Sequence, residues 1–286
     1  MKIAVLITSY NRVQTTIKCL SNVLNQKKIN EKFIVDIYLV DDKSTDNTSE
    51  IIKNKFQEIY LINGTGKLYW NKGMILAWQT AVEKKEYDFY LWLNDDTFIH
   101  HDAILHMIEC YNESLSKNHK FSIIVGACKE PNKEDVFSYG LRDDNGPIIP
   151  NGNIQNGKYI NGNIVLISNE IYKINGMLSD FYSHSFGDVD YGLSCLKKNI
   201  NIFTTKKFIA SCSTNEIIPP HFDSKNSLVK RFKFLNSPKG HSIRECFYFR
   251  KKFWGWKSIF FLTALILKVS FPSSYKKVVS SYNFLK

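Results

Sequence analysis

Four short apolar runs constrain the fold of this chain more than any other feature of its sequence. They cover residues 3–8, 33–40, 59–62 and 89–93. Strands with so little polar alternation are typical of a parallel sheet that is buried on both faces. Amphipathic helical patterns separate them, at 14–26, 47–56 and 72–84. This alternation of strand and helix predicts right-handed βαβ units, and therefore an α/β protein with a mostly parallel, Rossmann-like sheet flanked by helices.

Polar loops follow these runs at the point where each strand is predicted to end. The loops lie at 8–12, 41–46, 63–66 and 94–97. Because the carboxyl ends of parallel strands meet at one edge, the loops are expected to converge where open α/β sheets bind ligands. Asp95 and Asp96 are adjacent acids that repel each other unless a cation lies near them, and a divalent ion is the usual solution. A turn or a helix cap is the alternative for these residue types. The convergence of several such loops favours a nucleotide site.

The second half of the chain continues the alternation. Further elements are expected at 104–115, 122–126, 159–167, 168–176 and 187–199, with an irregular polar excursion at 129–158. Asp188 stands at the start of the last of these helices. It is either a helix cap or a catalytic carboxylate, and the pattern alone does not separate the two.

The charge is distributed unevenly along the chain. Residues 230–286 hold 13 of the 38 Lys and Arg residues and one of the 27 acids, so residues 1–229 carry a net charge of −1. In this tail, aromatic residues alternate with cations, and the apolar run 259–267 is shorter than the roughly 20 residues that span a bilayer. The pattern favours an amphipathic segment on an anionic membrane surface. Single-stranded nucleic acid and packing on the main body are the alternatives.

The cysteines and the first strand indicate the compartment. The six cysteines are scattered, without a C-x-x-C pair or metal spacing, and the apolar run at 3–7 is too short for a signal-peptide core. We therefore expect a cytoplasmic protein with reduced thiols, bound peripherally to the inner face of the membrane.

Five motifs, in order, resemble family 2 glycosyltransferases, which have the glycosyltransferase-A fold. They are residues 8–12, 40–46, 70–74, 94–96 (a version of the Asp-x-Asp motif) and 187–191. The resemblance spans about residues 1–225, and 70–74 looks like a subgroup that includes many bacterial rhamnosyltransferases. It implies a catalytic domain over 1–228, with a nucleotide-binding half (1–100) and an acceptor half (101–228). The helical, basic and aromatic tail would then be 229–286.

The resemblance also implies a role for individual residues. It places along the nucleotide the side chains or backbone of Thr8, Tyr10, Arg12, Asn71 and Gly73. The carboxylates of Asp41 and Asp42 would face the base and ribose, and Asp95 the ribose or sugar. Asp96 would hold Mg²⁺ or Mn²⁺ on the diphosphate, and His221 lies where family members often carry another metal ligand. Asp188 would be the general base, while Asp190 and Trp70 would contact the acceptor.

The chemistry fits these roles. Displacing a nucleoside diphosphate builds negative charge on the leaving group, which a divalent ion neutralises. The acceptor hydroxyl becomes a nucleophile when a carboxylate takes its proton. One base and one leaving group give a single in-line step and inversion at the anomeric carbon. The expected activity is transfer of a sugar from a nucleotide-diphosphate sugar to a glycan acceptor, lipid-linked and destined for the cell surface.

Three positions depart from the family pattern. Asn94 replaces the first acid of Asp-x-Asp, Gly187 replaces the acid that commonly precedes the base, and Ser194 replaces a common arginine. These departures are the support for one rival, a degenerate nucleotide-sugar-binding scaffold. The retained Asp96 and Asp188 argue against it. A second rival, a sugar-phosphate nucleotidyltransferase, would carry a Gly-rich basic loop after the first strand, which residues 8–12 do not provide.

Overall fold

The computed structural model describes residues 1–29, 31–118, 120–214 and 219–274. The chain forms two compact units. The first, which we call the sheet unit, comprises Met1–Asp180 and Gly187–Thr214. The second, the tail unit, comprises Phe181–Phe186 and Asn215–Lys286. The last twelve residues of the basic tail predicted from the sequence lie outside the described residues.

The sheet unit is built on an eight-stranded sheet with the order β3-β2-β1-β4-β9-β6-β10-β5. The strands are β1 (Lys2–Ser9), β2 (Ile34–Asp41), β3 (Tyr60–Asn63), β4 (Phe89–Leu93), β5 (Phe98–Ile99), β6 (Ser122–Lys129), β9 (Ile164–Ser168) and β10 (Asn201–Ser211). The first four strands run parallel, and β10 runs parallel to β6. β9 is antiparallel to both β4 and β6, and the short β5 is antiparallel to β10. The predicted α/β class and mostly parallel sheet are confirmed.

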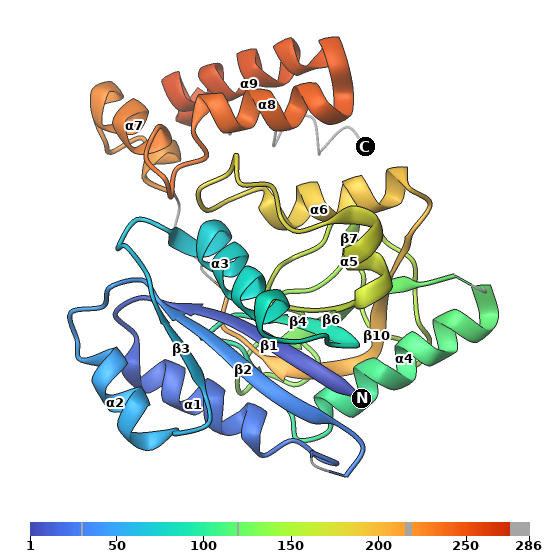
Figure 1. The fold of residues 1–286 in the computed structure, drawn as a ribbon. Helices are drawn as coiled ribbons and strands as arrows, with labels where there is room; N and C mark the ends of the chain where they lie inside the picture. Colours follow the sequence, from blue (N-terminus) through green and yellow to red (C-terminus); the bar gives the residue numbers. More distant parts are fainter. Residues whose placement is uncertain (30, 119, 215–218, 275–286) are drawn as a thin grey trace. The chain divides into compact units, whose positions relative to one another are not determined.

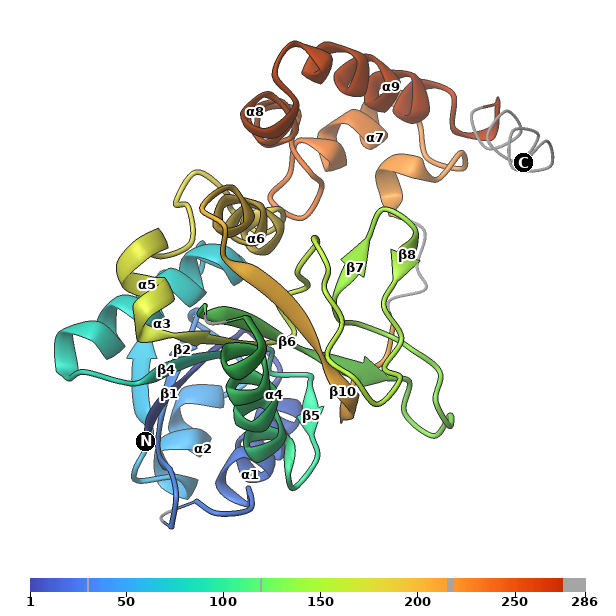
Figure 2. The same ribbon diagram turned by 90° about the vertical axis from the view of Figure 1, so that its right-hand side faces the viewer.

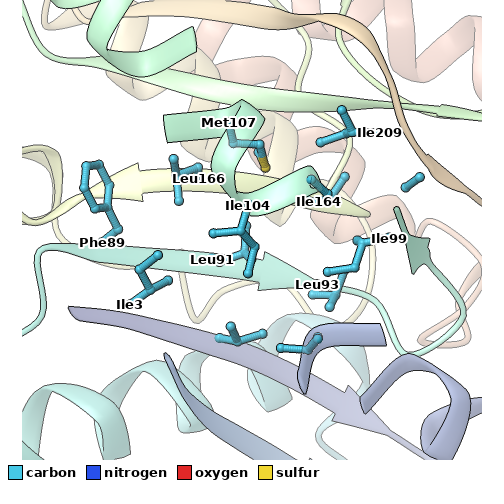
Figure 3. Packing of buried hydrophobic residues seen from close by; sticks show 14 of the residues in the cluster. Ile3, Phe89, Leu91, Leu93, Ile99, Ile104, Met107, Ile164, Leu166 and Ile209 are labelled. Carbon is cyan, nitrogen blue, oxygen red and sulfur yellow. The ribbon is translucent and has the colours of Figure 1, made fainter. Parts of the chain in front are cut away.

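Helices cover both faces of this sheet (Figure 1). They are α1 (Val13–Leu24), α2 (Thr48–Lys55), α3 (Tyr69–Lys84), α4 (Ala103–Asn118), α5 (Asn169–Asn175) and α6 (Gly187–Lys197). One apolar core joins α1, α2 and α4 to the sheet, and the other joins α3, α5 and α6 to the opposite face. In Figure 3, Ile104 and Met107 of α4 lie over Leu91, Ile164 and Leu166 of the sheet. Burial on two faces explains why the strand sequences show so little polar alternation.

The tail unit is helical. It contains η1 (Pro220–Phe222), α7 (Leu228–Leu235), α8 (Ile243–Trp254), η2 (Gly255–Lys257) and α9 (Ser258–Ser270). Gly255 ends α8 with φ at +58°, and α9 then packs back against α8 as a hairpin (Figure 1). Figure 2 shows the same pair with α8 seen end-on. The buried Arg231 of α7 stabilises this hairpin, because its Nη1 donates to the backbone oxygen of Val269, 2.7 Å away, at the end of α9. Unlike the domain predicted to begin at 229, this compact unit includes the preceding residues 219–228 and the separate segment 181–186.

One stretch of the described chain, Ile243–Ser270, is long and apolar enough by composition to cross a membrane. It comprises α8, η2 and α9, so the structure folds it back on itself at Gly255. The irregular excursion predicted at 129–158 carries a two-stranded ribbon of β7 (Arg142–Asp143) and β8 (Gly146–Pro147).

Candidate functional site

The polar loops after β1, β2 and β4 lie at one edge of the sheet, as predicted. Ser9 at the end of β1 is in register with Asp41 at the end of β2, and β4 runs parallel to β1. Figure 1 shows these strands ending on the same side. The candidate site is therefore assembled from the carboxyl ends of three neighbouring strands, together with the helices that follow them.

Hydrogen bonds fasten the first two loops to each other. The side-chain oxygen of Asn11 accepts a hydrogen bond from the backbone N–H of Thr45 (2.7 Å), and the Asn11 N–H donates to the hydroxyl of Ser44 (2.8 Å). Asp46 accepts from the backbone N–H of Val13, at the first turn of α1 (3.1 Å). The loop conformation is thereby fixed before any ligand binds.

Asp41 and Asp42, predicted to face the base and ribose, are buried and hydrogen-bonded within the protein. Asp42 accepts from three backbone N–H groups at the start of α3 and in the loop before it, those of Gly66 (2.7 Å), Leu68 (2.9 Å) and Tyr69 (3.0 Å). Asp41 accepts from the N–H and hydroxyl of Ser44 and from the hydroxyl of Ser49. The structure therefore shows these carboxylates organising the loops, and their contact with a nucleotide remains a prediction.

Thr8 and Gly73 lie against each other. A Cβ atom at Gly73 would come within 2.3 Å of the Thr8 hydroxyl oxygen, so only glycine lets α3 approach the end of β1 so closely. Tyr10, which follows in the same loop, is half exposed. Tyr10 and Arg12 are thus the accessible side chains among those predicted to line the nucleotide from this loop.

Arg12 supplies the cation that the adjacent acids require. Its Nη1 donates to Asp96 Oδ2 at 2.7 Å and to Asp95 Oδ1 at 3.2 Å. Burial raises the pKa of Asp95 to about 6, although the Arg12 charge opposes this shift. The sequence predicted a divalent ion in this role and placed Arg12 on the nucleotide. The pairing of Arg12 with these acids could have been predicted, because Arg12 follows β1 and the acids follow β4, the strand next to it. The long separation of Arg12 and the acids in the sequence concealed it.

Asp96 is the residue of this pair that a cation can reach. Its side chain is 38% exposed, whereas Asp95 is buried. No group of three His, Cys, Asp or Glu side chains converges as a metal site within the described ranges. Mg²⁺ and related ions are, however, often held by one or two carboxylates together with substrate phosphates and water. The hard, accessible oxygens of Asp96 fit a site of that kind.

Asn94 takes part in a network that explains why it is not an acid. Its oxygen accepts from the indole N–H of Trp70 (2.6 Å), and its nitrogen donates to the side-chain oxygen of Asn163 (3.1 Å). Asn163 in turn donates to the hydroxyl of Thr97 (3.1 Å). A residue that must accept on one side and donate on the other requires an amide, because a carboxylate has no donor.

Trp70 links this network to the candidate base. A Cβ atom at Gly162 would lie 2.4 Å from the Trp70 ring, so the indole lies directly on the Gly162 backbone. The Gly162 N–H donates to Asp188 Oδ2 (2.9 Å), and Asp188 Oδ1 accepts from the N–H of Val189 (2.8 Å). Burial raises the pKa of Asp188, and these two hydrogen bonds oppose that shift. A chain of contacts thus connects the Asn94–Asp96 loop to the partly exposed Asp188.

Gly187 is required by its neighbour Asn71. A Cβ atom at Gly187 would lie only 1.8 Å from the Asn71 side-chain oxygen. The buried Asn71 is held in place by donating from its nitrogen to the backbone oxygen of Ser179 (2.7 Å). The space that an acid at 187 would enter is therefore occupied by Asn71, which the sequence had assigned to the nucleotide.

Two other predicted residues lie in the interior of their units. Asp190 is 3% exposed, and Ser194 Oγ donates to its Oδ1 (3.3 Å). His221 belongs to the tail unit, where its buried ring packs against Phe222 and Phe234, and burial lowers its pKa to about 4. The acceptor role of Asp190 and the metal role of His221 remain predictions.

Residues 4–165 match the sequence model of the family described as Glycosyl transferase family 2. The poly-beta-1,6-N-acetyl-D-glucosamine synthase of Staphylococcus epidermidis is 28% identical over 137 residues, 47% of this chain and 30% of that protein. A poly(ribitol-phosphate) beta-glucosyltransferase of Bacillus spizizenii is 29% identical over 148 residues, 51% of this chain and 22% of that protein. The chain thus spans less than a third of the length of these relatives.

Solved structures share the fold. The crystal structure of S. aureus TarS 1-349 in complex with UDP-GlcNAc has a TM-score of 0.56 and 15% identity, and the match covers 94% of this chain and 79% of that one. The mannosyltransferase PcManGT from Pyrobaculum calidifontis, in complex with GDP-Man and Mn²⁺, also has a TM-score of 0.56, with 12% identity over 99% of this chain and 79% of that one. At these identities the likeness shows the fold alone.

Proposed function

Because this chain belongs to glycosyl transferase family 2, whose sequence model matches more than half of it, we propose that it is an inverting glycosyltransferase. The substrates are a nucleotide-diphosphate sugar and a glycan acceptor of the bacterial cell surface. The observation that carries the proposal is the connection of Asp188, through Gly162 and Trp70, to the loop that bears Asp96. Relatives named as a poly-N-acetyl-glucosamine synthase and a poly(ribitol-phosphate) glucosyltransferase support the acceptor class.

Asp188 acts as the general base in this proposal. It takes the proton of the acceptor hydroxyl while that oxygen bonds to the anomeric carbon and the bond to the diphosphate breaks. Burial raises its pKa, which makes it a stronger base than an exposed aspartate, and two backbone N–H groups fix its orientation. Attack opposite the leaving group inverts the anomeric carbon.

Asp96 serves the leaving group. It would hold Mg²⁺ or Mn²⁺ on the diphosphate, where the ion neutralises the charge that develops as the sugar departs. Arg12, which contacts Asp96, would add a second positive charge beside the same phosphates. A neighbour with this fold that holds GDP-Man and Mn²⁺ supports the assignment.

The tail unit is suited to a lipid-linked acceptor, because it presents an apolar face beside cations. At least half of the surface of five large side chains in and after the hairpin is exposed: Trp256, Ile259, Phe260, Leu267 and Phe271. The exposed Lys257 directly follows Trp256, and the exposed Lys252 lies four residues before it. Aromatic and apolar side chains beside lysines fit the interface of an anionic membrane. We place the protein peripherally on the cytoplasmic face, where lipid-linked saccharides are assembled.

The test is a panel of nucleotide sugars, assayed for binding and slow hydrolysis with Mn²⁺ or Mg²⁺ and then with EDTA. One donor that binds only with metal supports the class and the role of Asp96. Asp188→Asn should retain donor binding and lose transfer by about 10²–10⁴-fold, the usual contribution of a general base. A protein that binds no donor, or that is indifferent to the Asp188 substitution, would be a scaffold instead.

A further inference from the structure

The segment Phe181–Phe186 interrupts the sheet unit in sequence but folds with the tail unit. Its first and last residues stack on α8. The ring of Phe181 stacks on that of Tyr248, with 3.8 Å between the centroids, and the ring of Phe186 stacks on that of Phe249, at 4.9 Å. Two ring pairs on one helix therefore fix both ends of this six-residue segment.

Glu245 fixes the middle of the segment. Its Oε1 accepts a hydrogen bond from the backbone N–H of Ser183 at 2.8 Å. Glu245 precedes the two stacking aromatics of α8 by three and four residues, so all three lie on the same face of the helix. It is the only acid among residues 230–286, and it is 6% exposed. A buried carboxylate that accepts from a backbone N–H makes a strong and specific attachment.

The segment leads directly to the candidate base. Phe186 has φ at +71°, a conformation that bulky residues seldom adopt, so the surrounding contacts must hold it there. Gly187 is the next residue and the first of α6, and Asp188 is the second. The contacts of α8 therefore hold the chain as far as Phe186, the residue before α6.

We infer that Glu245 is a positioning residue for sugar transfer, because its hold on Ser183 fixes the segment that sets the placement of Asp188. The inference rests on the proposed function of Asp188. It also means that α8 holds the segment that leads covalently into α6.

Glu245→Ala and Glu245→Gln test the inference in the full chain. Glu245→Ala should lower kcat about tenfold, the factor expected for one lost charge-assisted hydrogen bond, and should leave the KM for the donor within about twofold. Glu245→Gln keeps an oxygen for Ser183 and should recover most of kcat. Hydrogen exchange of the peptide containing residues 181–190 should be faster in the alanine variant only. Lys251→Ala, an exposed change on the same helix, is the matched control and should behave as wild type.

Phe181→Leu provides an independent test if the alanine variant does not fold. It keeps Glu245 and removes the ring stack on Tyr248, together with the ring's contacts to Arg244 and Tyr182. It should also lower kcat and accelerate exchange at 181–190. If the wild-type protein turns over and neither Glu245→Ala nor Phe181→Leu lowers kcat, this inference is overturned and the proposed function stays intact. A wild-type protein without turnover on any donor would overturn both.

Discussion

Replacing Gly187 with alanine should destabilise the sheet unit by about 2–5 kcal/mol. The new Cβ would lie 1.8 Å from the Asn71 oxygen, whereas real Cβ contacts essentially never fall below 3.0 Å, so that oxygen must retreat by at least about 1.2 Å. The Asn71 side chain then loses its 2.7 Å hydrogen bond to Ser179, at a position that is closed to solvent. An unsatisfied buried polar group costs about 1–3 kcal/mol and overpacking about 1–3 kcal/mol more.

A double-mutant cycle measured by denaturant unfolding separates this cause from others. Asn71→Ala alone should cost about 1–3 kcal/mol, through the lost hydrogen bond. In the double variant the shortened side chain at position 71 leaves room for the methyl group added at position 187. The destabilisation of the double variant should therefore be smaller, by more than about 1 kcal/mol, than the sum of those of the two single variants. Strict additivity, or a Gly187→Ala variant within about 0.5 kcal/mol of wild type, would refute the reasoning.

Three further predictions concern the site and the tail. The value of kcat/KM should fall as the pH falls through the pKa of Asp188, because only the carboxylate accepts a proton. Burial raises that pKa, so the fall in kcat/KM should occur above the ordinary value of 3.8. This pH dependence should disappear in Asp188→Asn. Asn94→Asp removes the donor to Asn163 and should lower the free energy of unfolding by about 1–3 kcal/mol, and an unchanged denaturation midpoint would contradict the network. A variant with serine at both Trp256 and Phe260 should lose most of its binding to vesicles containing anionic lipid. Ile174→Ser, at an exposed apolar residue of the sheet unit, should keep that binding. If both variants lost vesicle binding equally, the tail would be excluded as the membrane contact.

The sequence predicted the sheet and the edge at which its polar loops meet, because both depend on local patterns. Apolar runs such as 89–93 have no exposed face, and loop residues that end parallel strands must share one edge. The direction of β9 was not predicted. The hydrophobic pattern of a five-residue apolar strand does not indicate in which direction the strand runs. The antiparallel pairing with β4 depends on how the chain returns through the 129–158 excursion.

The contacts that define the site were less predictable, because they join residues far apart in the chain. Arg12 and Asp96 are 84 positions apart, and Ser183 and Glu245 are 62 apart. The departures at 94 and 187 appeared as losses when each was considered alone. In the structure each has a partner that accounts for it, Asn163 for the first and Asn71 for the second, and only the folded chain brings these partners together.

The fold-back at Gly255 also determines how the chain can cross, or fail to cross, a bilayer. α8 and α9 have 12 and 13 residues, so each arm is about 18–20 Å long, short of a hydrocarbon layer of about 30 Å. If this hairpin inserted into a membrane, it would enter and leave through the same leaflet. Its two ends would then share one side of the membrane, and insertion would require no translocation of polar chain to the other.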